Sequence, residues 1–155
     1  MPKLNPPKFF VDSMLGTLAK KLRMFGFDCK YESAIDDDSL VLIAKKQDRI
    51  VLTKDLKLAI NCLQHDIKTI KIQNNSDKEQ LIEIAHQINY NKFQLTYSRC
   101  TLCNGSLEDI AKNAMLKKIP RRILESKEKF WKCKECNHVY WMGTHISNMK
   151  NLLLM

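Results

Sequence analysis

The sequence lacks any long apolar run. No stretch approaches the ~20 consecutive apolar residues that a membrane-spanning helix requires, and the N-terminus shows no segment of signal-peptide form. Cysteine is scarce as well, with six residues in a chain of 155, which does not suit the dense disulfide framework of a small secreted protein. From these absences we expect a soluble, cytoplasmic protein without a membrane partner.

Four of the six cysteines form two C-x-x-C pairs, Cys100 with Cys103 and Cys133 with Cys136. Two thiolates at this spacing reach one metal ion at ~2.3 Å, and two such pairs complete the tetrahedral coordination of a structural Zn²⁺. Two disulfides, or unrelated thiols, are the alternative, which fits a basic, cysteine-poor chain less well. The other two cysteines lie in apolar runs and are expected to be buried.

The net charge of the chain is +9, and it is unevenly distributed. Residues 96–155 contain 11 of the 26 basic residues but only 5 of the 17 acidic residues. This region would remain basic even after four thiolates bound one Zn²⁺. Such a surplus favours a polyanionic partner, and RNA or DNA is the leading candidate.

The first part of the chain alternates between the apolar patterns of strands and helices. A capping box at Ser76 and Glu79 opens the last helix, and Gly26 is placed to end the first. We predict strands at 8–11, 27–31, 49–53 and 67–72, with helices at 15–25, 36–44, 56–63 and 76–88. This order indicates an α/β fold with a mainly parallel sheet covered by helices on both faces. Residues 89–94 are polar and form the predicted linker between a domain at 1–94 and one at 95–155.

Acidic residues follow three of the predicted strands. Asp12 comes after the first strand, Asp37 and Asp38 lie between the second strand and its helix, and Asp55 follows the third. Ligands of parallel sheets bind outside the carboxyl ends of the strands, so these side chains should converge. Gathered carboxylates suit Mg²⁺ or Mn²⁺, which can activate water against a phosphodiester. Each Asp taken alone could instead be a helix cap or turn residue.

Basic side chains offer candidate phosphate contacts in both halves. Lys20 and Arg23 share one face of the first helix, although Arg23 could also be an ion-pair partner of the acidic cluster. Pro120 interrupts the basic stretch between the cysteine pairs, so one long helix is not expected there. Trp131 and Tyr140 could stack on bases or pack the core of the module. The candidates in the second half are Lys117, Lys118, Arg121 and Arg122.

Several segments resemble the Mut-seven C-terminal RNase domain family. The resemblance is carried in the first half by residues 11–16 and 18–23, by Asp37 with Leu40, and by residues 50–55. In the second half, segments 99–105, 130–136 and 139–145 are similar to the zinc ribbon of that family in order and spacing, with a slight departure at Gly-Thr-His 143–145.

The resemblance implies a PIN-like nuclease joined to a C-terminal zinc ribbon, and a metal-dependent ribonuclease activity. It places Asp12, Asp37 and Asp55 at the catalytic metal site, where Mg²⁺ or Mn²⁺ would bind. PIN-like nucleases usually gather three or four acids. Here either Asp38 or Asp77 is the candidate for the fourth position, or the site binds only one tight metal.

Two other functions compete with the ribonuclease. A noncatalytic RNA- or ribosome-binding adaptor would use the basic ribbon, but the acids at positions 12, 37 and 55 favour an enzyme. A phosphatase-like hydrolase would need a second Asp two positions after Asp12, where Met14 stands. A toxin role remains open, as do the RNA substrate, the endo- or exonucleolytic mode and the oligomeric state.

Overall fold

A four-stranded parallel sheet forms the centre of the first half of the chain. The structure is a computed structural model that describes residues 5–90, 93–115 and 117–142. The strands are β1 (Phe9–Val11), β2 (Cys29–Tyr31), β3 (Ile50–Thr53) and β4 (Thr69–Lys71), and they lie in the order β2-β1-β3-β4. All three strand pairings are parallel. The predicted α/β fold with a parallel sheet is confirmed.

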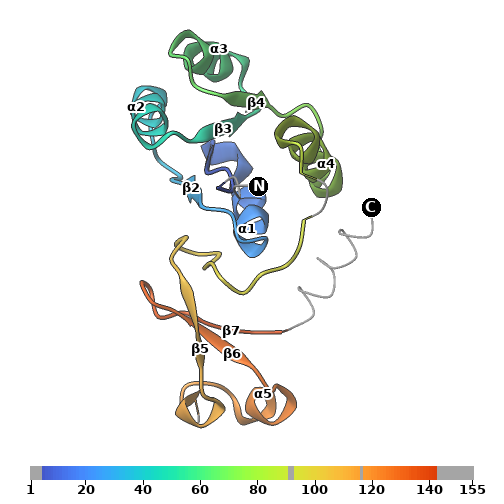
Figure 1. The fold of residues 1–155 in the computed structure, drawn as a ribbon. Coiled ribbons are helices and arrows are strands. Elements are labelled where there is room, and N and C mark those ends of the chain that lie inside the picture. The colour runs from blue at the N-terminus through green and yellow to red at the C-terminus, as the bar shows by residue number, and fades with distance from the viewer. Residues whose placement is uncertain (1–4, 91–92, 116, 143–155) are drawn as a thin grey trace.

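Helices cover both faces of this sheet (Figure 1). Alternate residues of a strand point to opposite faces, so Phe9 and Val11 pack with α1 (Gly16–Met24) and α4 (Asp77–Ile88). Phe10 packs on the other face with α2 (Asp37–Gln47) and α3 (Leu56–Gln64). The sheet is therefore buried from both sides, as its nearly continuous apolar strands indicate.

Side-chain caps fix where three of the helices begin. Asp36 accepts a hydrogen bond from Ser39 N at 2.9 Å at the start of α2, Asp55 caps α3, and Ser76 caps α4 through Glu79 N at 3.2 Å. Gly26 ends α1 with a φ of 91°, where a Cβ would come within 2.6 Å of Thr96 Oγ1. The caps place Asp37 and Asp55 at helix starts that follow strands.

The second half forms a separate three-stranded antiparallel sheet. Its strands β5 (Leu107–Ile110), β6 (Phe130–Cys133) and β7 (Val139–Trp141) lie in that order. Between β5 and β6 the chain forms the short helices η2 (Lys112–Met115) and α5 (Arg121–Ser126), and Pro120 caps α5. The interruption expected at this proline is confirmed. The module has its own small core of Met115, Ile119, Leu124 and Phe130.

The segment predicted as a polar linker is partly buried. Phe93 is only 3% exposed and belongs to the core of the first half. Its ring stacks on Phe25 with centroids 5.1 Å apart, and Thr96 N donates to Met24 O at 3.0 Å. The predicted linker therefore packs on the first half of the chain, because one aromatic side chain among polar neighbours anchors the segment on α1.

Candidate functional site

The strand order creates a switch point between β1 and β3. From β1 the chain crosses to β2 on one side, and from β3 it crosses to β4 on the other. The crevice outside the carboxyl ends of two such strands is where open α/β sheets bind ligands. Asp12 follows β1 directly, and Asp55 follows β3 by two residues. The fold therefore places two of the predicted acids at the position expected of a ligand site.

Asp12 is held in a fixed orientation by both of its carboxylate oxygens. The residue is 8% exposed, its backbone N–H donates to Leu52 O at 2.9 Å, and Oδ1 accepts from Ser13 N at 2.7 Å. Oδ2 accepts from the hydroxyl of Thr53 at 2.7 Å. These bonds fix the direction of the carboxylate at the start of η1 (Ser13–Leu15).

Thr53 connects Asp12 with Asp55. Its hydroxyl oxygen accepts a hydrogen bond from Asp55 N at 2.9 Å, and its O–H donates to Asp12 Oδ2. The side chain is fully buried. The sequence reasoning missed this residue. The sequence feature that could have identified it is a threonine at the last position of a buried strand, two residues before an acid. A buried hydroxyl at that position needs hydrogen-bond partners.

Asp37 and Asp38 lie in the first turn of α2, and both are exposed. Burial and then the charges of Asp12, Asp55 and Asp38 raise the pKa of Asp37, while Lys57 lowers it. One carboxylate raises the pKa of another only when the two groups lie close together. The site therefore gathers negative charge from three separate segments of the sequence.

The acids are nevertheless spread apart. Among the described residues, the four cysteines are the one group of three or more potential ligands whose ligating atoms all lie within 4.8 Å of one another. Carboxylate oxygens are the hard donors that Mg²⁺ and Mn²⁺ prefer, and Mg²⁺ keeps several of its waters in protein sites. The acidic residues fit a hydrated cation that is held by few direct ligands.

The two candidate phosphate ligands of α1 differ in exposure. Lys20 is exposed. Arg23 is 5% exposed and donates from Nε to Cys29 O and from Nη1 to Thr101 O, both at 2.8 Å. A guanidinium that is buried on two backbone carbonyls is not available to RNA, so we correct the predicted role of Arg23 in substrate binding.

Asp77, the alternative fourth acid, forms an ion pair with Lys21. Lys21 is largely covered, and burial lowers the pKa of its ammonium group. Asp77 also lies in the first turn of α4, where its negative charge interacts favourably with the helix dipole. With Asp77 committed to this pair, Asp38 is the better fourth candidate.

The sulfur atoms of the four predicted zinc ligands lie close together. Cys100 Sγ lies 3.6 Å from Cys136 Sγ, and Cys103 Sγ lies 3.4 Å from Cys133 Sγ. All four are free thiols. Sulfurs ~2.3 Å from one zinc ion at tetrahedral angles are about 3.8 Å apart, close to these distances. The cluster has the donors and the spacing of a metal site.

The thiols of the cluster differ, because burial raises the pKa of Cys103 to about 12 whereas backbone N–H groups favour the thiolate of Cys133. Burial opposes ionisation of Cys133, but backbone N–H groups of Cys136 and Glu135 donate to its sulfur and lower its pKa to about 7. Tyr140 Oη lies 2.9 Å from Cys100 Sγ. Gly105 lets the first knuckle approach the second, because a Cβ there would meet Cys133 Sγ at 2.9 Å.

The predicted RNA contacts of the ribbon differ in exposure. Lys117, Lys118, Arg121 and Arg122 are all exposed on or before α5. Trp131 is 8% exposed and stacks on Tyr97 with centroids 4.0 Å apart, so it packs the module rather than standing free.

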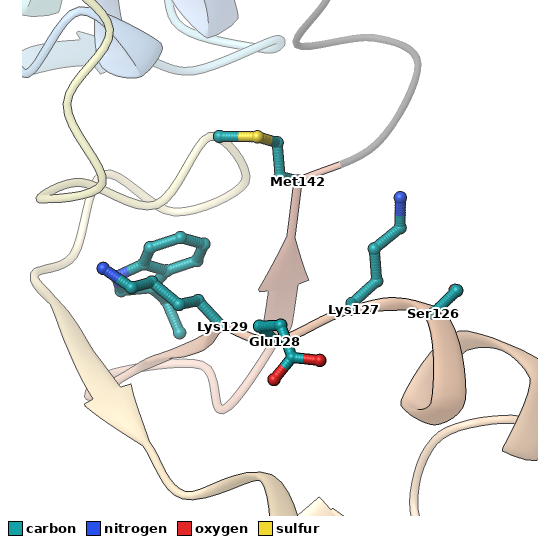
Figure 2. A pocket seen from close by; sticks show the side chains of 6 residues that line it. Ser126, Lys127, Glu128, Lys129 and Met142 are labelled. Carbon is teal, nitrogen blue, oxygen red and sulfur yellow. The ribbon is translucent and has the colours of Figure 1, made fainter.

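A shallow hollow of about 370 Å³ lies beside Trp131 in the ribbon, far along the chain from the acids. Figure 2 shows Met142 on one side of it and Lys127, Glu128 and Lys129 on the other. The motif at 143–145 lies outside the described residues. No helix in the described part of the chain has the length and apolar character to cross a membrane.

The chain is of the mixed α/β class, with a parallel four-stranded sheet that has acids at its switch point and a four-cysteine cluster compatible with a zinc ribbon. The Mut7-C RNAse domain model matches residues 7–153, and the chain belongs to this family. The resemblance seen in the sequence is thereby confirmed. A comparison with curated proteins gave no significant match. Membership indicates ribonuclease-type activity and an RNA substrate.

Proposed function

We propose that this protein is a metal-dependent ribonuclease that hydrolyses RNA phosphodiester bonds at the acidic crevice between β1 and β3. Asp12, Asp37 and Asp55 would hold Mg²⁺ or Mn²⁺, with Asp38 as the fourth acid. The observation that carries this proposal is the placement of Asp12 and Asp55 just beyond the carboxyl ends of β1 and β3 at the switch point. The raised pKa of Asp37, caused by burial first and then by the charges of Asp12, Asp55 and Asp38, supports it.

A bound divalent cation would supply an activated water and charge stabilisation at the phosphodiester. The chain itself fixes the carboxylates. Thr53 orients Asp12 and restrains the backbone of Asp55, so two acids keep their relative positions without a ligand. Asp37 lies on another element and is exposed, so it can adapt to substrate. Lys20, also exposed, is the remaining candidate on α1 for a phosphate contact.

The direct test incubates the purified full chain with labelled single-stranded and structured RNAs in Mg²⁺, Mn²⁺ or EDTA. We expect cleavage with either cation and none in EDTA, and mapped ends separate endonuclease from exonuclease action. Tight RNA binding without cleavage under every metal condition would contradict the enzyme and support the RNA-binding adaptor.

Cation binding should be visible in stability as well as in activity. Because the pKa of Asp37 is raised, the native state binds a proton there more tightly than the unfolded chain does. The ionised site therefore costs stability as pH rises above 3.8, the ordinary value. We expect Asp37→Asn to raise the melting temperature in EDTA at pH 7, and Mg²⁺ to stabilise the wild type more than this variant.

Asp48→Asn is the control for that experiment. Asp48 is exposed at the C-terminal end of α2, in the left-handed conformation that asparagine also tolerates. Its removal should leave the stabilisation by Mg²⁺ unchanged. Equal stabilisation of the wild type and the Asp37→Asn variant by Mg²⁺ would remove Asp37 from the cation site.

We further propose that the cysteine cluster binds one structural Zn²⁺ and that the basic surface of the ribbon binds RNA. Neutralising Lys117 and Lys118 to glutamine should weaken RNA binding. It should also flatten the dependence of affinity on salt, by about 0.7 of a log-log slope unit per lost contact to single-stranded RNA. Single-turnover cleavage at saturating RNA should change little, because the acids lie on the other sheet. Fluorescence titrations across salt concentrations provide the measurement.

The matched control neutralises Lys46 and Lys68, which are exposed and lie near the amino ends of β3 and β4. It removes the same charge from the whole protein but not from the ribbon. If both double variants lose the same affinity, the effect reflects net charge alone. In that case Lys117 and Lys118 are not RNA contacts.

A further inference from the structure

The strand β2 is an edge strand with open hydrogen-bonding groups. Among the described strands it pairs only with β1, and Phe9 N donates to Asp28 O at 2.8 Å. Along a strand the groups that face one neighbour alternate with those that face away. The N–H and C=O of Cys29, the next residue, therefore point out of the sheet. Uncovered groups of this kind invite pairing with another chain.

The first cysteine knuckle covers these groups. Asn104 Oδ1 accepts from Cys29 N at 3.0 Å. Arg23 Nε donates to Cys29 O, and Arg23 Nη1 donates to Thr101 O inside the knuckle, both at 2.8 Å. The N–H of Cys29 is thus satisfied by Asn104 of the ribbon, and its C=O is satisfied by Arg23 of α1, which is itself bonded to the knuckle. An asparagine side chain and a buried arginine take the place of a neighbouring strand.

The contact continues through Asp28 to the centre of the sheet. Asn104 Nδ2 donates to Asp28 Oδ1 at 2.7 Å, and Arg49 Nη1 donates to the same oxygen at 2.8 Å and to Phe9 O at 3.1 Å. Burial opposes ionisation of Asp28, but the hydrogen bonds from Arg49 and Asn104 hold its pKa below the usual value. The amino ends of β1, β2 and β3 are therefore tied to one side chain of the knuckle.

The turn around the cysteine cluster determines where this side chain lies. Asn104 directly follows Cys103, has a φ of 70°, and donates its backbone N–H to Cys100 O at 3.0 Å. This left-handed conformation is part of the knuckle turn that directs the sulfurs of Cys100 and Cys103 toward the cluster. The gathered sulfurs therefore help to hold Asn104 opposite Cys29, together with Arg99 Nη1, which donates to Asn104 O at 2.9 Å.

The second knuckle contains a natural comparison. Asn137 follows Cys136 in the same way, with a φ of 65° and a backbone N–H bonded to Cys133 O at 3.1 Å. Its side chain is exposed and makes no hydrogen bond within the described part of the chain. The left-handed turn explains why an asparagine stands at both positions. Of the two, only Asn104 makes side-chain hydrogen bonds to Cys29 and Asp28.

We propose that Asn104 is a positioning residue that couples metal binding in the ribbon to closure of the β2 edge. Metal binding orders the knuckle, the ordered knuckle presents Asn104, and Asn104 covers Cys29. The inference rests on the proposed metal site but not on catalysis. By linkage, the factor by which metal protects the edge equals the factor by which the edge contact strengthens metal binding.

Amide hydrogen exchange of the full chain tests this coupling. In zinc-loaded protein we expect Asn104→Gly to speed exchange at Cys29 about tenfold or more, the scale of one or two lost hydrogen bonds. Removal of zinc from the wild type should give a similar acceleration. Zinc affinity, measured by competition with a chromophoric chelator, should fall by the corresponding factor. Glycine tolerates the left-handed turn, so the variant keeps the knuckle.

Asn137→Gly is the matched control and should leave the exchange of Cys29 unchanged. A reciprocal pair of substitutions provides rescue. N104D places two carboxylates together, whereas N104D with D28N restores an amide facing a carboxylate with the roles exchanged. The Cys29 amide should lose its protection from hydrogen exchange in N104D and regain it in the double variant. A general loss of stability would not produce this recovery.

The outcomes separate the two proposals. If elemental analysis finds no zinc in the wild type, the metal site fails and the coupling fails with it. If zinc binds but Cys29 exchanges at the same rate in wild type, N104G and zinc-depleted protein, only the coupling is overturned.

Discussion

Replacing Asp55 by asparagine is expected to lower RNA cleavage by about a hundredfold or more, the scale on which one lost electrostatic group slows a transition state. Asp55 caps α3 through Lys57 N at 2.9 Å, and asparagine caps a helix as well as aspartate does. The substitution thus removes the charge and keeps the shape. Single-turnover kinetics at saturating Mg²⁺ give the loss, and circular dichroism checks the fold.

Asp48→Asn is again the appropriate comparison, because it removes one negative charge near the amino end of β3 rather than beyond its carboxyl end. Its cleavage rate should match that of the wild type. Full activity of the Asp55→Asn variant would place the chemistry elsewhere, since no cation site at this switch point could lose Asp55 without effect.

Replacing Cys136 by serine should abolish tight zinc binding and unfold the ribbon. The Cys136 side chain is exposed, so the substitution disturbs little packing and acts through the lost thiolate. Metal binding contributes about 10–16 kcal/mol in comparable small zinc modules, where it is largely folding free energy. Elemental analysis should give one zinc per chain in the wild type and about none in the variant.

The unfolding should be greatest in β5 to β7 and weaker in the parallel sheet, where hydrogen exchange should accelerate mainly at the β2 edge. Cys62→Ala is the control, because Cys62 is buried between α3 and the sheet, away from the cluster. It should keep its zinc. Zinc affinity should also fall as pH drops, because protons compete with the metal for the four thiolates. A stably folded ribbon without metal would refute this role.

Patterns within short segments predicted much of the fold. The alternation of strand and helix was correct because each element carries its own apolar period and several helices carry local start or stop signals, as at Ser76 and Gly26. The cysteine cluster was predictable because its four ligands occur in two local pairs. The acids were expected at one edge because parallel strands share a direction. Their roles as ligands stay a prediction.

Predictions that depended on contacts between distant segments were less reliable. Arg23 has the sequence context of a solvated helix residue, yet it bonds to Thr101, 78 residues away. Phe93 was assigned to a linker, because nothing near it in sequence reveals the ring of Phe25. Thr53 was overlooked, because its value lies in joining Asp12 to Asp55 across two strands.

The sequence by itself determined the alternation of elements, the two cysteine pairs, and the presence of acids after three strands, since each depends on residues a few positions apart. Only the tertiary structure decided the strand order that makes β1 and β3 a switch point, and the edge on which Asn104 lies. The physical reason is that strand order and edge contacts are chosen by the packing of whole elements. Asn104 and Asn137 follow equivalent cysteines in the sequence, and only one of them lies against an open strand.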